Sequence, residues 1–160
     1  MNTTGVAKEV ETLAYRFHPE SIAVDSVGIG AGVVDDLLRR GIEGVLSMNG
    51  AEAAHDRERF ANRRAELYWG LRERFFHGDI QLTNDPLLAE ELAQTRHIYT
   101  SAGKIQIEAK EQLKRRLGRS PDRADMLAML FYADWDTDDE QPRPSTPSRA
   151  AQLRSEMSGW

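Results

Sequence analysis

Apolar residues near the start of the chain change their spacing twice, and the pattern predicts a helix, a strand and a second helix. Residues 5–17 place apolar side chains three and four positions apart, which is typical of one helical face. Residues 22–24 are a continuous apolar run, which indicates a buried strand. Helical spacing returns over 32–41, and a further apolar run at 45–48 predicts another strand. The order strand, helix, strand predicts a βαβ unit with parallel strands.

The middle of the chain has the pattern of helices followed by a hairpin. Residues 52–76 show helical apolar spacing with an arginine-rich polar face, and they predict one long helix. Asp85 followed by proline predicts a capped helix over 87–94. Two short alternating runs, 97–100 and 104–108, are joined by Ser-Ala-Gly and predict a β-hairpin.

The last third of the chain predicts two more helices and then a tail. Residues 110–117 form a basic helical pattern that ends at a glycine. We expect Ser120 to cap a final helix with proline at its first position and a body over 124–132. From residue 134 the sequence is acidic and then rich in Pro, Ser and Thr, which predicts disorder over 134–160, apart from a possible short helix at 150–157.

Composition narrows the classes of protein that the chain can belong to. Its 160 residues, 40% of them hydrophobic, can bury the core of about one domain. The net charge of −5 provides no global basic field for nucleic acid or membranes. With no cysteine, disulfides, thiolate zinc sites and cysteine nucleophiles are excluded. No apolar run approaches the about 18 residues of a membrane helix, and no signal pattern is present, so we expect a cytoplasmic protein that makes no use of a membrane. A metal would be held by oxygen or imidazole, which favours Mg²⁺ or Mn²⁺.

Three glycines, Gly28, Gly30 and Gly32, follow the first strand and raise the possibility of a nucleotide-binding α/β domain. Their spacing is Gly-x-Gly-x-Gly, whereas dinucleotide-binding turns have Gly-x-Gly-x-x-Gly. The acid expected about 20 residues later would fall near Met48 and Asn49, and neither is acidic. A tight strand-to-helix turn that requires small residues is therefore the favoured interpretation, and a nucleotide cofactor is the weaker one.

Acidic residues at two places are candidates for chemistry. Asp25 stands at the carboxyl end of the first strand, where open α/β sheets place their ligands. Asp122 and Asp125 are three positions apart in the first turn of the last helix and should share a face. Acids are also common at helix amino ends for dipole reasons alone, so for Asp122 both interpretations stay open. Asp35 and Asp36 are expected on the solvated face of their helix.

Basic residues are concentrated between positions 104 and 123, where seven cations face three acids. Such a strip beside a pair of carboxylates suits a phosphate backbone that approaches while the acids hold cations. An ordinary solvated helix surface is the alternative. We call these residues the basic strip: Lys104, Lys110, Lys114, Arg115, Arg116, Arg119 and Arg123. The histidines have no partner at ligand spacing and are expected to be structural or surface residues.

Four blocks of the sequence, taken in order, resemble the nuclease half of the large terminase subunit of tailed phages. They are Val-Asp-Ser-Val-Gly-Ile-Gly-Ala-Gly-Val-Val-Asp (24–35), Arg-Phe-Ala-Asn-Arg-Arg-Ala-Glu-Leu-Tyr-Trp-Gly-Leu-Arg (59–72), Gly-Lys-Ile-Gln-Ile-Glu-Ala-Lys (103–110) and Ser-Pro-Asp-Arg-Ala-Asp-Met-Leu-Ala (120–128). By motif position, the resemblance implies that Asp25 is the family's second catalytic acid and that Asp125, assisted by Asp122, is the last. It further implies a two-ion site for Mg²⁺ or Mn²⁺ at these three residues, and DNA contacts at the basic strip.

The sequence departs from the family in two respects. The family's first acid lies on a hairpin upstream of the helix at 5–17, and this sequence has no such hairpin. The phosphate-binding loop Gly-x-x-x-x-Gly-Lys-Ser/Thr of the family's ATPase motor is also missing. We therefore expect an α/β, ribonuclease H-like nuclease fold, truncated at its N-terminal strands, over residues 1–133, and a disordered C-terminal tail over 134–160.

The resemblance implies a phage or prophage protein of the bacterial cytoplasm that cleaves concatemeric double-stranded DNA during packaging. Its implied partners are DNA, the missing terminase segment, the small terminase subunit and the portal. An alternative from another class is a non-catalytic terminase remnant, or an assembly or DNA-binding piece that needs a partner polypeptide. The missing first acid favours this alternative for the isolated chain.

Overall fold

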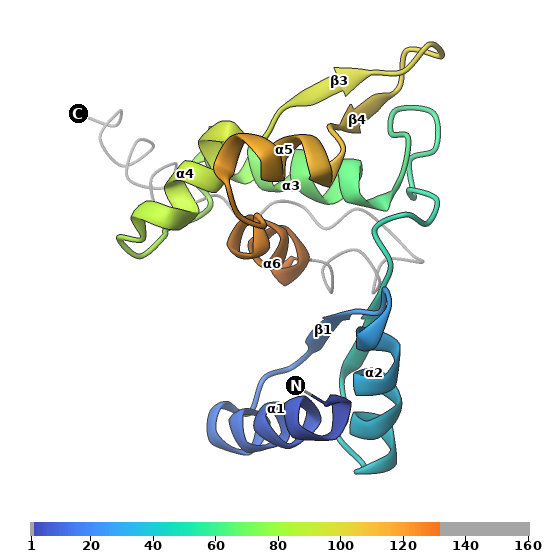
Figure 1. Cartoon of the computed structure of the whole chain (residues 1–160), viewed down its shortest axis with the longest axis vertical. Coiled ribbons are helices and arrows are strands. Elements are labelled where there is room, and N and C mark those ends of the chain that lie inside the picture. Colours follow the sequence, from blue (N-terminus) through green and yellow to red (C-terminus); the bar gives the residue numbers. More distant parts are fainter. Residues whose placement is uncertain (1, 132–160) are drawn as a thin grey trace, which may run out of the picture.

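The computed structural model describes residues 2–131, which form helices around two small sheets (Figure 1). No helix in this part of the chain is long and apolar enough to span a membrane. The elements are α1 (Thr3–Phe17), β1 (Ile22–Asp25), α2 (Ile29–Arg39), β2 (Val45–Met48), α3 (Arg63–His77), α4 (Pro86–Gln94), β3 (His97–Tyr99), β4 (Ile105–Ile107), α5 (Lys110–Leu117) and α6 (Asp122–Leu130). The predicted tail, the possible helix at 150–157 and the end of the predicted last helix lie outside the described residues.

The predicted βαβ unit is present. β1 and β2 pair in parallel, with Ile22 opposite Val45 and Asp25 opposite Met48. α1 and α2 pack against each other and cover one face of this sheet, where Ile22, Val24 and Val45 contact a small core. That core is formed by Ala7, Val33, Leu37 and Ile42. Apolar side chains at alternate strand positions are thus partly buried against the helices, whereas the continuous apolar run of 22–24 predicts a strand buried on both faces.

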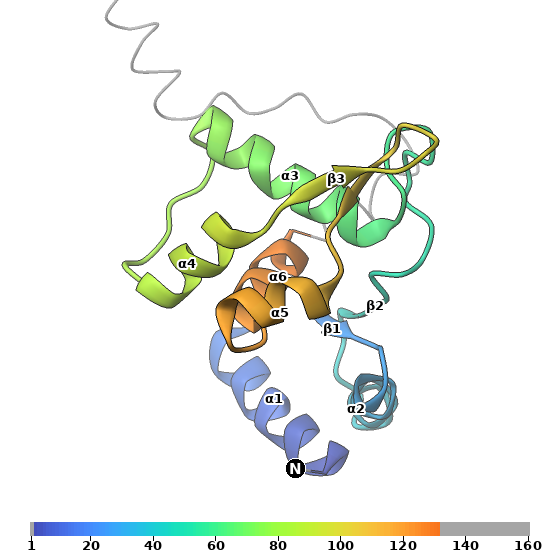
Figure 2. The ribbon, with the colours of Figure 1, turned by 45° about the horizontal axis from the view of Figure 1, so that its top comes forward.

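A larger core holds the rest of the described chain together. α3 lies between the β3–β4 hairpin and α6, and α4 and α5 complete the group (Figure 2). Its buried residues include Phe60, Leu71, Ile107 and Leu127. Met48 at the end of β2 also belongs to this core, so the second strand connects the βαβ unit to the helical part.

α2 begins at Ile29, three positions earlier than the sequence pattern predicts. The helix comes so close to β1 that a Cβ on Gly30 would lie 1.6 Å from the carbonyl oxygen of Asp25. Gly28 precedes the helix with φ 66°, a conformation that favours glycine. Two of the three glycines therefore have a steric reason in the strand-to-helix turn.

α3 begins at Arg63, so the prediction of one helix over 52–76 is wrong in its first half. The buried carboxylate of Glu66 accepts the backbone N–H groups of His55 and Asp56, at 2.8 and 2.9 Å, and so stabilises a loop. The next residues form a bridge to β4, since Ala61 N–H donates to the carbonyl of Ile105 at 2.9 Å. Asn62 then caps α3, because its side chain accepts the N–H of Ala65.

The remaining predictions agree closely with the structure. β3 and β4 form the antiparallel hairpin, and α5 spans the predicted residues and ends at Gly118. Asp85 caps α4 by accepting two N–H groups.

The cap of α6 was predicted wrongly: Pro121 holds that position, and the Ser120 hydroxyl donates to the side chain of Asp122 at 2.5 Å.

Candidate functional site

The three candidate acids line one cleft of about 340 Å³ between β1 and α6. Asp25 and Asp125 are about one hundred positions apart in the sequence, and the fold places both in its wall. Side chains on the sheet face opposite α1 and α2 form one side, and the exposed face of α6 forms the other. The lining residues are Ser21, Ala23, Asp25, Lys110, Asp122, Asp125, Met126, Met129 and Leu130.

Asp25 is solvent-exposed, as is Asp122. Asp25 is the last residue of β1, and its Oδ1 accepts the backbone N–H of Val27 at 3.0 Å. This bond stabilises the turn that leads to α2, so the carboxylate has a local structural role. Its second oxygen makes no hydrogen bond within residues 2–131 and remains available to a ligand.

Asp125 is held by three protein donors. Its Oδ1 accepts the Tyr68 hydroxyl at 2.6 Å and the Arg64 guanidinium at 3.3 Å, and its Oδ2 lies 2.8 Å from Lys110 Nζ. Burial alone would raise the pKa of Asp125, but the hydrogen bonds from Lys110 and Tyr68 and the charge of Arg64 hold it below its usual value. Burial and the charge of Asp125 raise the pKa of Tyr68, so its hydroxyl stays protonated and donates. Asp125 is therefore an anion at neutral pH.

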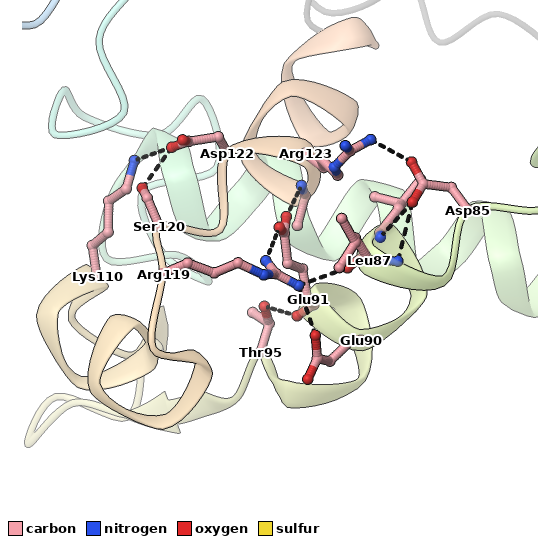
Figure 3. A network of polar contacts seen from close by, with 12 residues as sticks. Asp85, Leu87, Glu90, Glu91, Thr95, Lys110, Arg119, Ser120, Asp122 and Arg123 are labelled. Atoms are coloured by element: carbon pink, nitrogen blue, oxygen red, sulfur yellow. Dashed lines mark hydrogen bonds and ion pairs between the residues drawn. The ribbon is translucent and has the colours of Figure 1, made fainter.

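Lys110 connects the two acids of α6. Its Nζ is 3.7 Å from Asp122 Oδ1 as well as 2.8 Å from Asp125 Oδ2, and Figure 3 shows the side chain extending from the start of α5 toward Asp122. Burial would lower the pKa of Lys110, but the hydrogen bond to Asp125 and the charges of both acids raise it above its usual value. The ammonium group thus occupies the space between the carboxylates as a permanent cation.

The candidate ligands have the right chemistry for a metal ion, but they are not clustered closely enough to form a ready site. All three candidate ligands are carboxylates, which suits hard cations such as Mg²⁺ and Mn²⁺. Within residues 2–131, however, no three acidic or histidine side chains lie close enough together to form a ready metal cluster. None of the four histidines lines the cleft.

Most cations of the basic strip have partners within the protein. Arg116 pairs with the buried Glu108, and Arg123 pairs with Asp85 at 2.6 Å. Arg119 contacts Glu90 and the buried Glu91 (Figure 3). Glu91 also accepts the backbone N–H of Ala124. Lys104 Nζ donates to the carbonyl of Arg57 at 2.5 Å. With Lys110 engaged in the cleft, Lys114 and Arg115 are the strip residues without a partner in the described part of the chain.

Sequence reasoning missed two parts of this arrangement. Arg64 and Tyr68 are one helical turn apart on α3 and reach Asp125, and that spacing within the second resembling block was the available signal. Asp36 was expected to be solvated, but it is only 7% exposed and pairs with Arg39 and Arg40 at 3.1 and 3.3 Å. Its two arginine partners at three and four positions allow this burial.

This mixed α/β fold is that of the nuclease domain of a phage large terminase subunit, which confirms the expected ribonuclease H-like class. The nuclease domain of the large terminase subunit of bacterial virus Sf6 matches with a TM-score of 0.66 and 23% identity, over 81% of this chain and 72% of that chain. A lysine-to-alanine mutant of the same domain with manganese matches with a TM-score of 0.65 and 23% identity, over 81% of this chain and 73% of that chain. The lysine-to-alanine mutant of gp2c from the large terminase subunit of bacteriophage Sf6, with calcium, matches with a TM-score of 0.66 and 23% identity, over 81% of this chain and 72% of that chain. No family model and no curated protein matches the chain.

Proposed function

We propose that this chain is a terminase-type DNA endonuclease that uses Mg²⁺ or Mn²⁺ to cleave concatemeric double-stranded DNA. The observation that carries the proposal is the cleft that Asp25 from β1 lines together with Asp122 and Asp125 from α6. Convergent carboxylates from separate elements are what two-metal phosphodiester cleavage requires. The fold shared with a terminase nuclease domain supports the same conclusion.

In this proposal Asp25, Asp122 and Asp125 hold the metal ions. Solved structures with the same fold contain manganese or calcium, which supports a divalent cation. Bound ions would activate water and stabilise the leaving oxygen. Because Lys110 lies between the two acids of α6, its ammonium must be displaced before both can serve as ligands.

The proposed partners follow from the same function. Duplex DNA would contact the basic strip, where Lys114 and Arg115 have no competing partner in the described residues. The remaining terminase segment, the small terminase subunit and the portal are proposed partners for packaging in the bacterial cytoplasm.

A non-catalytic assembly or DNA-binding piece is the second candidate. The contacts of Asp125 favour it, because both of its oxygens are engaged by Tyr68, Arg64 and Lys110. A carboxylate whose two oxygens both bind protein donors can have a purely structural role. This candidate predicts DNA binding or partner binding without cleavage.

Nicking of supercoiled plasmid in Mn²⁺ separates the two candidates. For the nuclease we expect Asp25→Asn and Asp125→Asn each to lower the rate by about a hundredfold or more, since each removes a charge that positions a metal ion. Asp35→Asn is the matched control, because Asp35 is exposed on the adjacent helix and lies outside the cleft. A well-folded wild-type chain that fails to nick DNA with any divalent ion, alone or with its partner segment, would replace the nuclease proposal by the second candidate.

A further inference from the structure

Arg59 is an exposed arginine held by aromatic rings. Its guanidinium carbon lies 5.1 Å from the centre of the Phe60 ring and 5.2 Å from that of Trp69. Within residues 2–131 it has no carboxylate partner, in contrast to the arginines of the basic strip that pair with acids. A guanidinium that stacks through its face leaves the N–H groups on its edge free to bind an anion.

The loop that carries Arg59 is fixed beside the hairpin. Ile105 N–H donates to the carbonyl of Arg59 at 2.8 Å, and the backbone N–H of Arg59 donates to Asp56 Oδ1 at 3.0 Å. Figures 1 and 2 both show this loop next to the turn between β3 and β4. Arg59 is therefore presented by ordered backbone, which lowers the entropic cost of binding a ligand.

Further cations and rings surround this position. Arg57 is exposed and unpaired in the described part of the chain, and the Lys104 ammonium is bound to its carbonyl oxygen. The His97 ring meets Trp69 edge-on at 5.5 Å. Two exposed acids, Asp56 and Glu58, also lie in the loop, so the surface is only moderately basic overall. We call it the arginine–tryptophan surface: Arg57, Arg59, Trp69, His97 and Lys104.

We propose that the arginine–tryptophan surface, which shares Lys104 with the basic strip, is a second phosphate-binding site that binds the backbone of duplex DNA away from the cleft. Planar guanidinium groups with free edges match phosphate oxygens, and their contacts carry no sequence preference. Arg64 contacts Asp125 from the first turn of α3, and Trp69 lies five residues later on the same helix, so α3 connects the cleft to the arginine–tryptophan surface. This inference rests on the proposed function, in which DNA is the ligand, and it adds a surface by which the chain binds that DNA.

DNA binding by the full chain, measured by fluorescence anisotropy in EDTA over a series of salt concentrations, tests the proposal. EDTA prevents cleavage, so the outcome does not depend on nuclease activity. We expect the double variant Arg57→Ala/Arg59→Ala to reduce the slope of log affinity against log salt by about 0.9 for each phosphate that the variant no longer binds. Two duplexes of unrelated sequence should give the same result.

Three further variants make the test specific. Arg16→Ala is the matched control, because Arg16 also stacks on a ring, at 5.1 Å from Phe17, and it should leave the slope unchanged. Arg59→Lys should keep the slope and weaken DNA binding at fixed salt, since lysine retains the charge without the planar stack. Because it is a smaller change than alanine, it also tests the proposal if the alanine variant misfolds. Lys114→Ala/Arg115→Ala measures the basic strip separately.

Three results would overturn the proposal. The first is a wild-type slope in Arg57→Ala/Arg59→Ala, and the second is an equal reduction of the slope in Arg16→Ala. The third concerns poly-glutamate, used as a probe for an acidic protein partner: if Arg57→Ala/Arg59→Ala abolished poly-glutamate binding and left DNA binding intact, the surface would be assigned to such a partner. A chain that never cleaves DNA but shows the expected reduction in slope would refute the nuclease proposal and retain this one.

Discussion

Lys110 is the residue on which metal binding in the cleft depends most directly. Its ammonium group is closer to Asp125 than to Asp122, and it neutralises part of the charge that would attract a divalent cation. The ammonium blocks the Asp125 oxygen that an ion would bind, and it repels an approaching divalent cation. The side chain is 42% exposed, so it can rotate toward solvent when an ion arrives.

Replacing Lys110 by alanine should therefore strengthen Mn²⁺ binding. We expect about a tenfold lower Kd in calorimetric titration, equivalent to about 1.4 kcal/mol, because the competing cation is removed. Lys114→Ala is the control, since this lysine lies on the same helix and contacts no acid in the described chain. If Lys110→Ala weakened Mn²⁺ binding, Lys110 would support the site rather than compete for it.

Glu108 joins two elements, the hairpin and α5. Its Oε1 accepts the backbone N–H of Arg96 at 2.9 Å, and the Arg116 guanidinium contacts both carboxylate oxygens, at 2.6 and 2.5 Å. The hydrogen bond from Arg116 is the main reason that the pKa of Glu108 lies below its usual value, against the effect of burial. Because the pKa of Glu108 is lower in the folded state, the group contributes its full stability at pH values above its unfolded pKa of 4.5. This contribution disappears as the pH falls through the folded pKa.

Glu108→Gln should accordingly lower stability at neutral pH and flatten its decline in acid. We expect the free energy of unfolding at pH 7 to fall by about 2 kcal/mol, since charged hydrogen bonds are removed. The difference from wild type should shrink as the pH falls from 4.5 through the lowered pKa of the folded wild-type carboxylate, where that group takes up its proton. Urea denaturation at several pH values measures this effect, and Glu111→Gln, an exposed change in the first turn of α5, should show none of it. A difference that is constant with pH would contradict the assignment.

The elements that local sequence determines were predictable, and those fixed by distant contacts were not. The hairpin and α5 carry their own turn and stop residues, and both agree with the structure. The start of α3 depends on Glu66, whose carboxylate binds loop N–H groups that no local pattern reveals. In the site, strand-end and helix-start positions pointed to Asp25 and Asp125. Two of its three donors, Tyr68 and Arg64, lie 57 and 61 positions away in the sequence, so their pairing with Asp125 became visible only in the fold.

At the scale of the whole molecule, β1 has hydrogen-bonding capacity that the described residues do not use. Ile22 N–H donates to Gly44 and Ser26 N–H donates to Met48, both at 2.8 Å, so alternate residues turn their backbone groups toward β2. Ala23 lies between them and turns its N–H and carbonyl groups away from β2. Within residues 2–131 the sheet has two strands, and β1 is therefore an open edge.

Apolar side chains next to this edge make strand addition favourable. Met126 and Leu130 on α6 are each 66% exposed and line the cleft beside β1. The run of apolar residues in β1 is typical of a strand buried on both faces, yet all three are only half-buried. We therefore expect the isolated chain to be marginally stable or to self-associate through β1, because pairing of two edges would satisfy backbone groups and cover this surface.

Proline substitution in β1 tests this expectation. Ala23→Pro removes an outward N–H and adds bulk at the edge without breaking the ladder to β2, so it should abolish self-association and leave the Tm unchanged. Val24→Pro removes an inward N–H and should unfold the chain, which shows that the first variant acts through the edge. Sedimentation velocity over a range of concentrations measures association, and thermal denaturation followed by circular dichroism measures folding. A wild-type chain that is a stable monomer at every concentration would contradict the expectation. Association that persists in Ala23→Pro would place the contact on another surface.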